Sequence, residues 1–488
     1  MKVWKKAVFF GMVLVIALSF ASGCGRTQTT TDERGVTTEG NKVYKGNYSE
    51  KTIIKVDFFD IGYGSEWIYE QARDFVYENE EYAIFLNADS SLVSNFQKKL
   101  EAGKNLSDLY IVPDADWETF TAQNWLVPIN DVYESKPDGE EGDTVHDKLT
   151  GMYQEAGYYT NEANPSTNGY YVLPWTQMVT GIAYNVDLFE EYGLEVPETM
   201  AEFKTVCDTI ISKSNGKVAP IVIPGKIGGY TDFLIKNWWI QASGLEGVKE
   251  FFAYDSVEVF NPDKQPYAGY QRALEEFEKY FGGANNQFAK YVLNGSMSKD
   301  AYTAQSDFIN GRAAMTVNAN WLENEMINMV EDSEFNMKLM RVPFLEGAQQ
   351  DEDGYVAVNY ATSGFDFMCI PTKAKEVDGA KKFMTFMTRD SQLKSFTRTT
   401  GSVRPYDYDY NSLRGELSDF ANSVLDILDS SSTTYFDYQT GPLRYNAQMN
   451  LTGMFWDRII NGNGNSARAY VEAEYAEAQV RWDRDWVK

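Results

Sequence analysis

The sequence predicts an α/β fold, in which helices cover a mostly parallel sheet. Residues 53–59 (Ile-Ile-Lys-Val-Asp-Phe-Phe) are too continuously apolar for a half-exposed strand, which is typical of an interior parallel strand. Segments with helix and strand periodicity then alternate along the chain, as they do in sheets wound by right-handed crossovers. The chain has 488 residues, of which 43% are hydrophobic, and this length suits two or three domain-sized bodies.

The first part of the chain supplies five elements in order. After the strand at 53–59, apolar residues between 67 and 76 recur every three or four positions, which predicts one face of a helix. Residues 82–86 return to a strand, 92–100 form a second helix, and 109–112 form a third strand. The order is βαβαβ.

The later part of the chain repeats this organisation. Thr199 and Glu202 form a capping box at the start of a helix that extends to residue 211. Residues 220–224 form a short buried strand, and Phe365 to Ile370 another. Further amphipathic helices are predicted at 377–387, 417–428 and 471–482.

The N-terminal segment has the form of a secretory signal. Three lysines precede an apolar stretch at 7–20 that ends in Ala-Ser-Gly-Cys at 21–24, which predicts a signal peptide at 1–23. The stretch is shorter than the roughly 20 residues of a membrane-spanning helix. It resembles a bacterial lipobox, which implies that Cys24 becomes the lipidated first residue. Residues 24–49 are polar and rich in Thr, which predicts a flexible tether.

Charge and residue counts exclude several classes of protein. Removal of the three N-terminal lysines takes the net charge from −27 to −30, which argues against a nucleic-acid partner. His146 is the only histidine and no cysteine pair has zinc-site spacing, so zinc clusters and HExxH chemistry are excluded. The acidic runs at 351–354 and 407–410 lack calcium-loop spacing. No metal or cofactor is expected, and Cys207 and Cys369 are predicted to be buried.

Several motifs, in order, resemble the family of extracellular solute-binding proteins that includes maltose-binding protein. Trp125 to Ile129, Gly181 to Phe189 with its Tyr-Asn-x-Asp-Leu-Phe string, and Phe308 to Met315 followed by Asn320 and Trp321 carry the resemblance. The remaining matches are 100–110, 169–175, 364–371 and 401–405. Arg312 departs from the family's usual Lys. The resemblance covers about residues 50 to 410.

The resemblance implies a type II-like periplasmic-binding-protein fold, with two discontinuous lobes joined by a three-segment hinge. The crossings are expected near 175–180, 359–363 and 400–406. The first lobe is then 50–177 plus 362–402, and the second is 178–361 plus 403–488. Ligand is expected in the cleft between the lobes, at the carboxyl ends of strands.

A carbohydrate ligand needs flat aromatic side chains for its C–H face and bidentate polar groups for its hydroxyls. The aromatic candidates near the crossings are Trp175, Trp321, Tyr360, Phe365 and one of Trp238 and Trp239, which as neighbours in a helix point about 100° apart. The polar candidates are Asp89, Asp116, Asn320, Asp366 and Arg404.

These features predict a monomeric, lipid-anchored solute-binding protein on the extracytoplasmic face of the cell membrane, without enzymatic activity. It captures a sugar or oligosaccharide and delivers it to the membrane permease subunits of an ABC importer by hinge closure. Two alternatives remain open. A secreted glycoside hydrolase needs only two carboxylates, and a ligand-sensing partner of a membrane receptor would share the same binding features.

Overall fold

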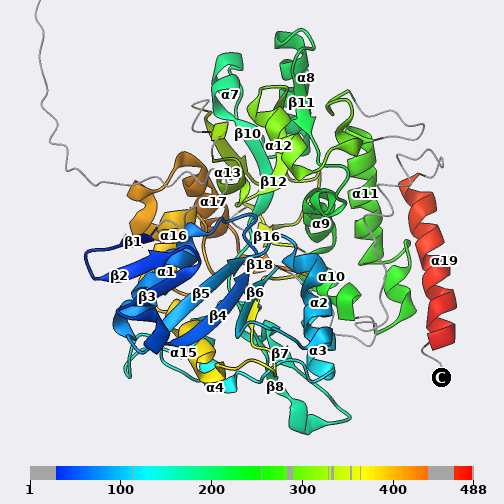
Figure 1. Ribbon diagram of the computed structural model, residues 1–488. Coiled ribbons are helices and arrows are strands. Elements are labelled where there is room, and N and C mark those ends of the chain that lie inside the picture. The colour runs from blue at the N-terminus through cyan, green and yellow to red at the C-terminus, as the bar shows by residue number, and fades with distance from the viewer. Residues whose placement is uncertain are drawn as a thin grey trace, which may run out of the picture.

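The computed structural model describes residues 29–485 except 114, 254, 283–289, 328, 331–334, 352–353, 363 and 438–465. Cys24 and the predicted signal peptide lie outside the described residues. Two α/β lobes make up the described chain, each with its own sheet (Figure 1). The predicted two-lobed α/β fold is confirmed.

The first lobe is built on an eight-stranded sheet with the order β1-β2-β3-β5-β4-β6-β17-β9. Its central strand β4 pairs in parallel with β5 and with β6, as the apolar run predicted, whereas β17 is antiparallel to both β6 and β9. The strands are β1 Thr29–Thr31, β2 Val36–Glu39, β3 Lys42–Lys45, β4 Thr52–Phe58, β5 Tyr82–Ala88, β6 Leu109–Val112, β9 Val172–Pro174 and β17 Phe367–Cys369.

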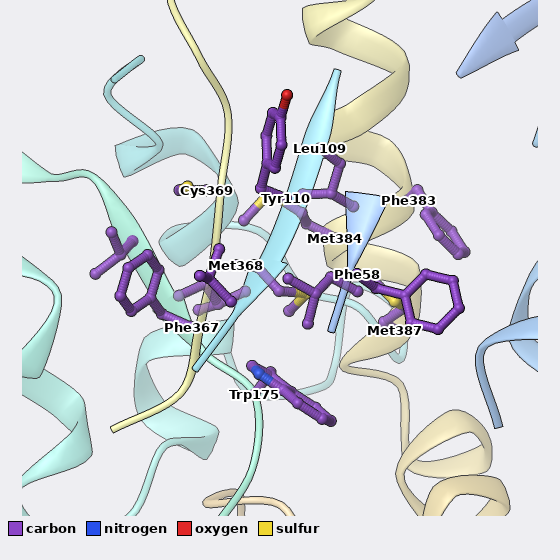
Figure 2. Close-up of a cluster of buried hydrophobic side chains, with 14 of the residues drawn as sticks. Phe58, Leu109, Tyr110, Trp175, Phe367, Met368, Cys369, Phe383, Met384 and Met387 are labelled. Carbon is purple, nitrogen blue, oxygen red and sulfur yellow. The ribbon is translucent and has the colours of Figure 1, made fainter. Parts of the chain in front are cut away.

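Four longer helices accompany this sheet: α1 Glu66–Glu78, α2 Leu92–Ala102, α15 Val377–Met387 and α16 Asp390–Thr400. Helix α1 buries Trp67, Ile68, Phe75 and Val76 on one face, as its periodicity predicted. Figure 2 shows part of this core, where side chains of β4, β6, β17 and α15 pack together. Shorter elements are α3 Trp117–Ala122, α4 Asn130–Tyr133, α5 Val145–Lys148, α6 Tyr153–Ala156, β7 Tyr158–Tyr159 and β8 Gly169–Tyr170.

The prediction of a flexible tether at 24–49 is wrong for the described residues of that segment. Strands β1 to β3 extend the first sheet, with β3 antiparallel to β5. Val36 and Val43 are buried in the first core. The composition misled because an edge strand needs only one core-facing apolar residue, and Thr, Val and Tyr all favour strands.

The second lobe is built on a four-stranded sheet with the order β11-β12-β10-β13. Strand β12 is buried along its whole length, and it pairs in parallel with β11 and antiparallel with β10. The strands are β10 Thr180–Asn185, β11 Ala219–Val222, β12 Ala313–Ala319 and β13 Met337–Met340, with a separate hairpin of β14 Gln350–Asp351 and β15 Gly354–Tyr355.

Helix α8 begins with the predicted capping box. The Thr199 side chain accepts a hydrogen bond from the Glu202 backbone N–H, and the Glu202 side chain accepts one from the Thr199 backbone N–H. The second-lobe helices are α7 Val186–Tyr192, α8 Met200–Lys213, α9 Gly229–Ser243, α10 Leu245–Ala253, α11 Tyr267–Phe281, α12 Ala301–Ile309, α13 Leu322–Glu325, α17 Asp419–Asp429 and α19 Ala467–Asp485. No helix in the described part of the chain is long and apolar enough to cross a membrane.

The crossings between the lobes lie side by side. Strand β16 (Val358–Tyr360) pairs in parallel with β18 (Thr433–Tyr435), and the Thr180 hydroxyl donates to the Tyr360 carbonyl. The assignment of 403–488 to the second lobe needs correction, because Val403, Tyr406 and Tyr408 are buried in the first core. Helix α19 does pack in the second lobe.

Candidate functional site

A contact between the lobes forms where the loop after β4 meets the loop after β12. Tyr63 is almost fully buried, and its hydroxyl accepts a hydrogen bond of 3.3 Å from the Asn320 amide. Gly62 has a φ of +97°, and a β-carbon placed on it would lie 3.7 Å from Cβ of Trp321. The first-lobe loop therefore lies directly against the second-lobe loop.

Asn320 fastens this contact to the crossings. Its Oδ1 accepts from the Val179 backbone at 3.1 Å, and its Nδ2 also donates to the Ser402 hydroxyl at 3.0 Å and to the Gln177 carbonyl at 3.3 Å. One buried side chain thus joins the first crossing, the third crossing and Tyr63. Its hydrogen-bonding capacity is engaged by the protein, so we interpret Asn320 as a residue that positions its neighbours.

Trp321 lies next to Asn320 and remains partly buried, in contact with both cores. Its ring meets the rings of Tyr230 and Phe233 edge-on, at 6.5 and 6.0 Å between centroids, respectively. Both partners come from the first turn or two of α9. Together with Trp321, these two residues form an aromatic surface, the aromatic wall, on the second lobe, opposite Gly62 and Tyr63.

Glu325 supplies a carboxyl group to this wall. It lies four residues after Trp321, and the Gln305 amide donates to it at 2.6 Å. Burial raises the pKa of Glu325, and the bond from Gln305 offsets part of that rise. Burial also raises the pKa of Tyr230, with the negative charge of Glu325 adding to the effect. We call Tyr63, Tyr230, Phe233, Trp321 and Glu325 the interlobe cluster.

Two first-lobe carboxylates are related to Tyr63, Asp366 through its charge and Asp60 through the loop that both residues share. Burial raises the pKa of Tyr63, and the charge of Asp366 contributes more to that rise than the charge of Glu325. Asp366 is itself buried. Asp60 lies on the same loop as Tyr63, and its Oδ1 is buried without a hydrogen-bond partner among the described residues. The cluster therefore combines aromatic faces with carboxylate acceptors, which is the chemistry that polyhydroxylated ligands need.

The other two predicted carboxylates hold local structure. Asp89 accepts from Lys99 at 2.8 Å and from the Ser91 hydroxyl at 2.6 Å. Burial opposes ionisation of Asp89, but these hydrogen bonds outweigh it and lower its pKa. Asp116 is exposed and caps α3 by accepting from the Thr119 backbone at 3.2 Å. Among the described residues, no hydrogen bond connects either Asp89 or Asp116 to the interlobe cluster, so their contact with ligand stays a prediction.

The structure contradicts a ligand-contacting role for Trp175. Its side chain is 3% exposed and stacks on Trp67 at 5.0 Å between centroids, with an interplanar angle of 15°. Tyr63 and Phe396 meet it edge-on at 5.6 and 5.7 Å. Figure 2 shows Trp175 alongside the labelled core residues of the first lobe. The Trp175 ring therefore packs against Tyr63 inside the first-lobe core.

Arg404 is also a core residue and not a ligand contact. It is 1% exposed and donates to the Met387 carbonyl and to the Gln71 side chain. Its guanidinium lies over the rings of Phe396 and Trp67 at 4.6 and 5.2 Å. Burial without a carboxylate partner lowers its pKa to about 10.

Four further aromatic predictions are corrected by burial. Trp238 and Trp239 are both fully buried and donate to the carbonyls of Pro343 and Pro266, so neither faces the cleft. Tyr360 is fully buried and donates to Asp437. Phe365 packs against Tyr153, Phe367 and Phe436 near the crossings.

Sequence reasoning missed Glu325, Tyr230 and Tyr63 as site residues. The chain has 71 acidic residues and 32 tyrosines, so residue type alone could not select these. The available signal was position. Glu325 falls one helical turn after Trp321, and Tyr63 lies between Gly62 and Gly64 in the turn that follows the central strand.

Two hollows lie away from the interlobe cluster. One of about 600 Å³ is lined by Arg34, Glu70, Arg73, Asp74, Ser395, Arg398 and Thr399. Its arginines are paired with carboxylates at 2.6 to 3.0 Å, so we assign it no ligand. The other, of about 400 Å³, lies beside the crossings and includes Gln177, Tyr406 and Thr434. In the described part of the chain, no group of three or more His, Cys, Asp or Glu is arranged to hold a metal.

Glu325 gives the cluster a testable pH signature. Because folding raises the pKa of Glu325 above its ordinary value of 4.5, the folded state binds its proton more tightly than the unfolded chain. The loss of folded-state stability that results from ionising Glu325 is absent at low pH, and it grows as pH rises through the range in which Glu325 ionises. We expect Glu325→Gln to melt above the wild type by a margin that widens as pH rises above the ordinary pKa of 4.5. Calorimetry measures this margin, with the exposed Glu101→Gln as control. Parallel melting curves for wild type and Glu325→Gln would contradict the burial of this carboxyl.

Comparison with known proteins identifies the family of the chain. Residues 42–394 match the family described as bacterial extracellular solute-binding protein. A multiple sugar-binding protein of Streptococcus mutans is 26% identical over 251 residues, which are 50% of this chain and 53% of that protein. The chain thus spans about half the length of that relative.

Solved structures share the fold at low sequence identity. The acarbose receptor GacH of Streptomyces glaucescens has a TM-score of 0.63 and 16% identity, over 89% of this chain and all of that one. A sugar transporter protein of Bacillus licheniformis, in complex with stachyose, has a TM-score of 0.56 and 15% identity, over 88% of this chain and all of that one. These likenesses show the two-lobed fold.

Proposed function

Because the chain belongs to the family of bacterial extracellular solute-binding proteins, we propose that it captures a carbohydrate between its two lobes for an ABC importer. The ligand class is an oligosaccharide. The mature protein is held at the extracytoplasmic face of the membrane by lipid on Cys24, and it delivers its ligand to the permease subunits. The proposal follows the sugar-binding name of the Streptococcus mutans relative and the stachyose and acarbose named for the structural neighbours.

The observation that carries the proposal is the interlobe cluster. The partly buried Trp321 offers a flat face beside Tyr230 and Phe233, and sugars present apolar C–H faces to such rings. Glu325 and Asp60 supply carboxylate oxygens, which accept hydrogen bonds from hydroxyl groups. The two loops that carry these residues belong to different lobes, so a ligand seated between them contacts both lobes.

The position of the interlobe cluster between the lobes lets ligand binding change the balance between the open and closed forms. A ligand can shift the balance between open and closed forms only if it makes different contacts in the two. Tyr63 and Gly62 already lie against Asn320 and Trp321 in this structure. Ligand binding that uses both loops stabilises the closed form, which is the form that a permease must distinguish.

We further propose that the protein does not cleave its ligand. The one carboxyl group of the interlobe cluster, that of Glu325, accepts a hydrogen bond from Gln305, and the family is one of binding proteins. This sets the proposal apart from the glycoside hydrolase alternative.

The test is a thermal-shift screen of the mature domain against stachyose, raffinose, acarbose and malto-oligosaccharides. Ligand at 100 times its Kd stabilises the fold by about 2.7 kcal/mol, so a true ligand raises the Tm. Chromatography of the same mixtures after prolonged incubation should return intact glycan. An unchanged Tm throughout, while amino acids or peptides raise it, would overturn the carbohydrate assignment. Cleavage that Glu325→Gln abolishes would favour the hydrolase instead.

A further inference from the structure

We propose that the first lobe rests against the outer face of the membrane and that the second lobe moves relative to it. The inference rests on the lipidation of Cys24 in the proposed function. It follows from where the anchored end of the chain enters the fold. That entry point is β1, the edge strand of the first-lobe sheet (Figure 1).

The N-terminal strands are an integral part of the first lobe. Strand β1 pairs with β2, β2 pairs with β3, and β3 pairs with β5 of the central sheet. Val36 and Val43 are fully buried in the first core. Residues 29–45 therefore move with the first lobe as one body.

Side chains hold these strands to helix α1 as well. Arg34 pairs with Asp74 at 2.6 Å, and Lys45 pairs with Glu80 at 2.5 Å. Both cations also lie over the ring of Tyr77, at 5.4 and 4.6 Å from its centroid. Arg34 thus fastens the turn between β1 and β2 to α1, and Lys45 fastens the end of β3 to Tyr77 of α1 and to Glu80 just after that helix.

The chain between the anchor and the fold is short. Thr29 begins β1, and covalent geometry lets the five residues from Cys24 span at most about 18 Å. A folded chain of this size has a radius of gyration of about 23 Å. The anchor cannot reach far enough for the molecule to turn over, so the edge at β1 stays next to the bilayer.

A tether running to residue 49 would have behaved differently. Its 26 residues could extend to roughly 90 Å, which would let either lobe approach the membrane. Folding of residues 29–45 removes that freedom. The lobe that is fixed near the membrane is therefore determined by β1 to β3.

The charge of this segment suits a lipid surface. Residues 29–51 contain four basic and four acidic residues in a chain whose net charge is −27. Anionic lipids repel acidic surfaces within about a Debye length, which is about 8 Å at physiological ionic strength. The N-terminal strands are therefore repelled less than the rest of the protein.

The test places a fluorophore on each lobe of the lipidated protein in phosphatidylglycerol-containing vesicles with nitroxide-labelled headgroups. Asn41→Cys labels the turn between β2 and β3, and Ser212→Cys labels α8 on the second lobe, where both native residues are exposed. Cys207 and Cys369 are buried and stay unlabelled. We expect severalfold stronger quenching at position 41 than at position 212.

A second variant carries a Gly/Ser insertion of about 20 residues between Gln28 and Thr29, which adds roughly 25 Å of root-mean-square reach. It should abolish most of the difference between the two labels. Equal quenching at both positions in the parent protein would overturn the proposal, as would an unchanged difference after the insertion. Mass spectrometry of Cys24 tests the lipid anchor separately from the orientation of the lobes. An unmodified Cys24 would overturn the lipid anchor, whereas a lipidated protein with equal quenching would overturn only the orientation.

Discussion

Replacement of Trp175 by alanine should destabilise the protein by about 3–5 kcal/mol, the range for removing a large aromatic side chain from a core. The ring stacks on Trp67 and meets Tyr63 and Phe396 edge-on, and all of these contacts would be lost. Arg404 also lies 6.0 Å from the Trp175 ring. The urea midpoint of unfolding measures the loss, and the Kd of the remaining folded protein should change little.

Trp175→Phe is the matched control. The indole Nε1 is buried without a hydrogen-bond partner among the described residues, so phenylalanine removes an N–H whose burial is costly while keeping an aromatic ring. We expect this variant to lose much less stability than Trp175→Ala. A Trp175→Ala protein with a normal urea midpoint and a weakened Kd would return Trp175 to the ligand site.

The fold was predictable wherever local pattern and burial agree. The apolar run at 53–59 predicted the central strand β4 because both faces of that strand are covered at Val56 to Phe58, and the capping box at Thr199 marked the start of α8. Strands β2 and β3 escaped prediction because each has a single buried valine among polar residues. Their stability comes from pairing with β5, which is distant in sequence.

The site was less predictable because it depends on which face of an element is covered. Helix α9 is buried on nearly all sides, so periodicity could not show that Trp238 and Trp239 both point into the core. Arg404 was predicted at the ligand because a guanidinium group can donate to two neighbouring hydroxyls. Its partners, Gln71 and the ring of Trp67, lie more than 300 positions earlier in the chain. Among the aromatic residues predicted to contact ligand, Trp321 alone has an incompletely buried side chain.

Replacement of Trp321 by alanine should weaken ligand binding with little loss of stability. If the ring covers one face of a sugar, its removal costs roughly 2 kcal/mol of binding free energy. That loss corresponds to a fall in affinity of about thirtyfold. Trp321→Phe keeps an aromatic face beside Tyr230 and Phe233, so it should recover most of the affinity.

Trp125→Ala provides the control for loss of a partly buried tryptophan. Trp125 stacks on Phe120 in the first lobe at 6.1 Å between centroids, and no measured contact connects it to the interlobe cluster. Its removal should lower the urea midpoint somewhat and leave the Kd unchanged.

The most direct measurement of the central claim is therefore calorimetric titration of the wild type, Trp321→Ala and Trp125→Ala with the glycan that most raises the Tm. Carbohydrate capture at the interlobe cluster predicts one site per molecule, a Kd raised about thirtyfold in Trp321→Ala alone, and an unaltered Kd in Trp125→Ala. An unchanged Kd in a folded Trp321→Ala protein would contradict it.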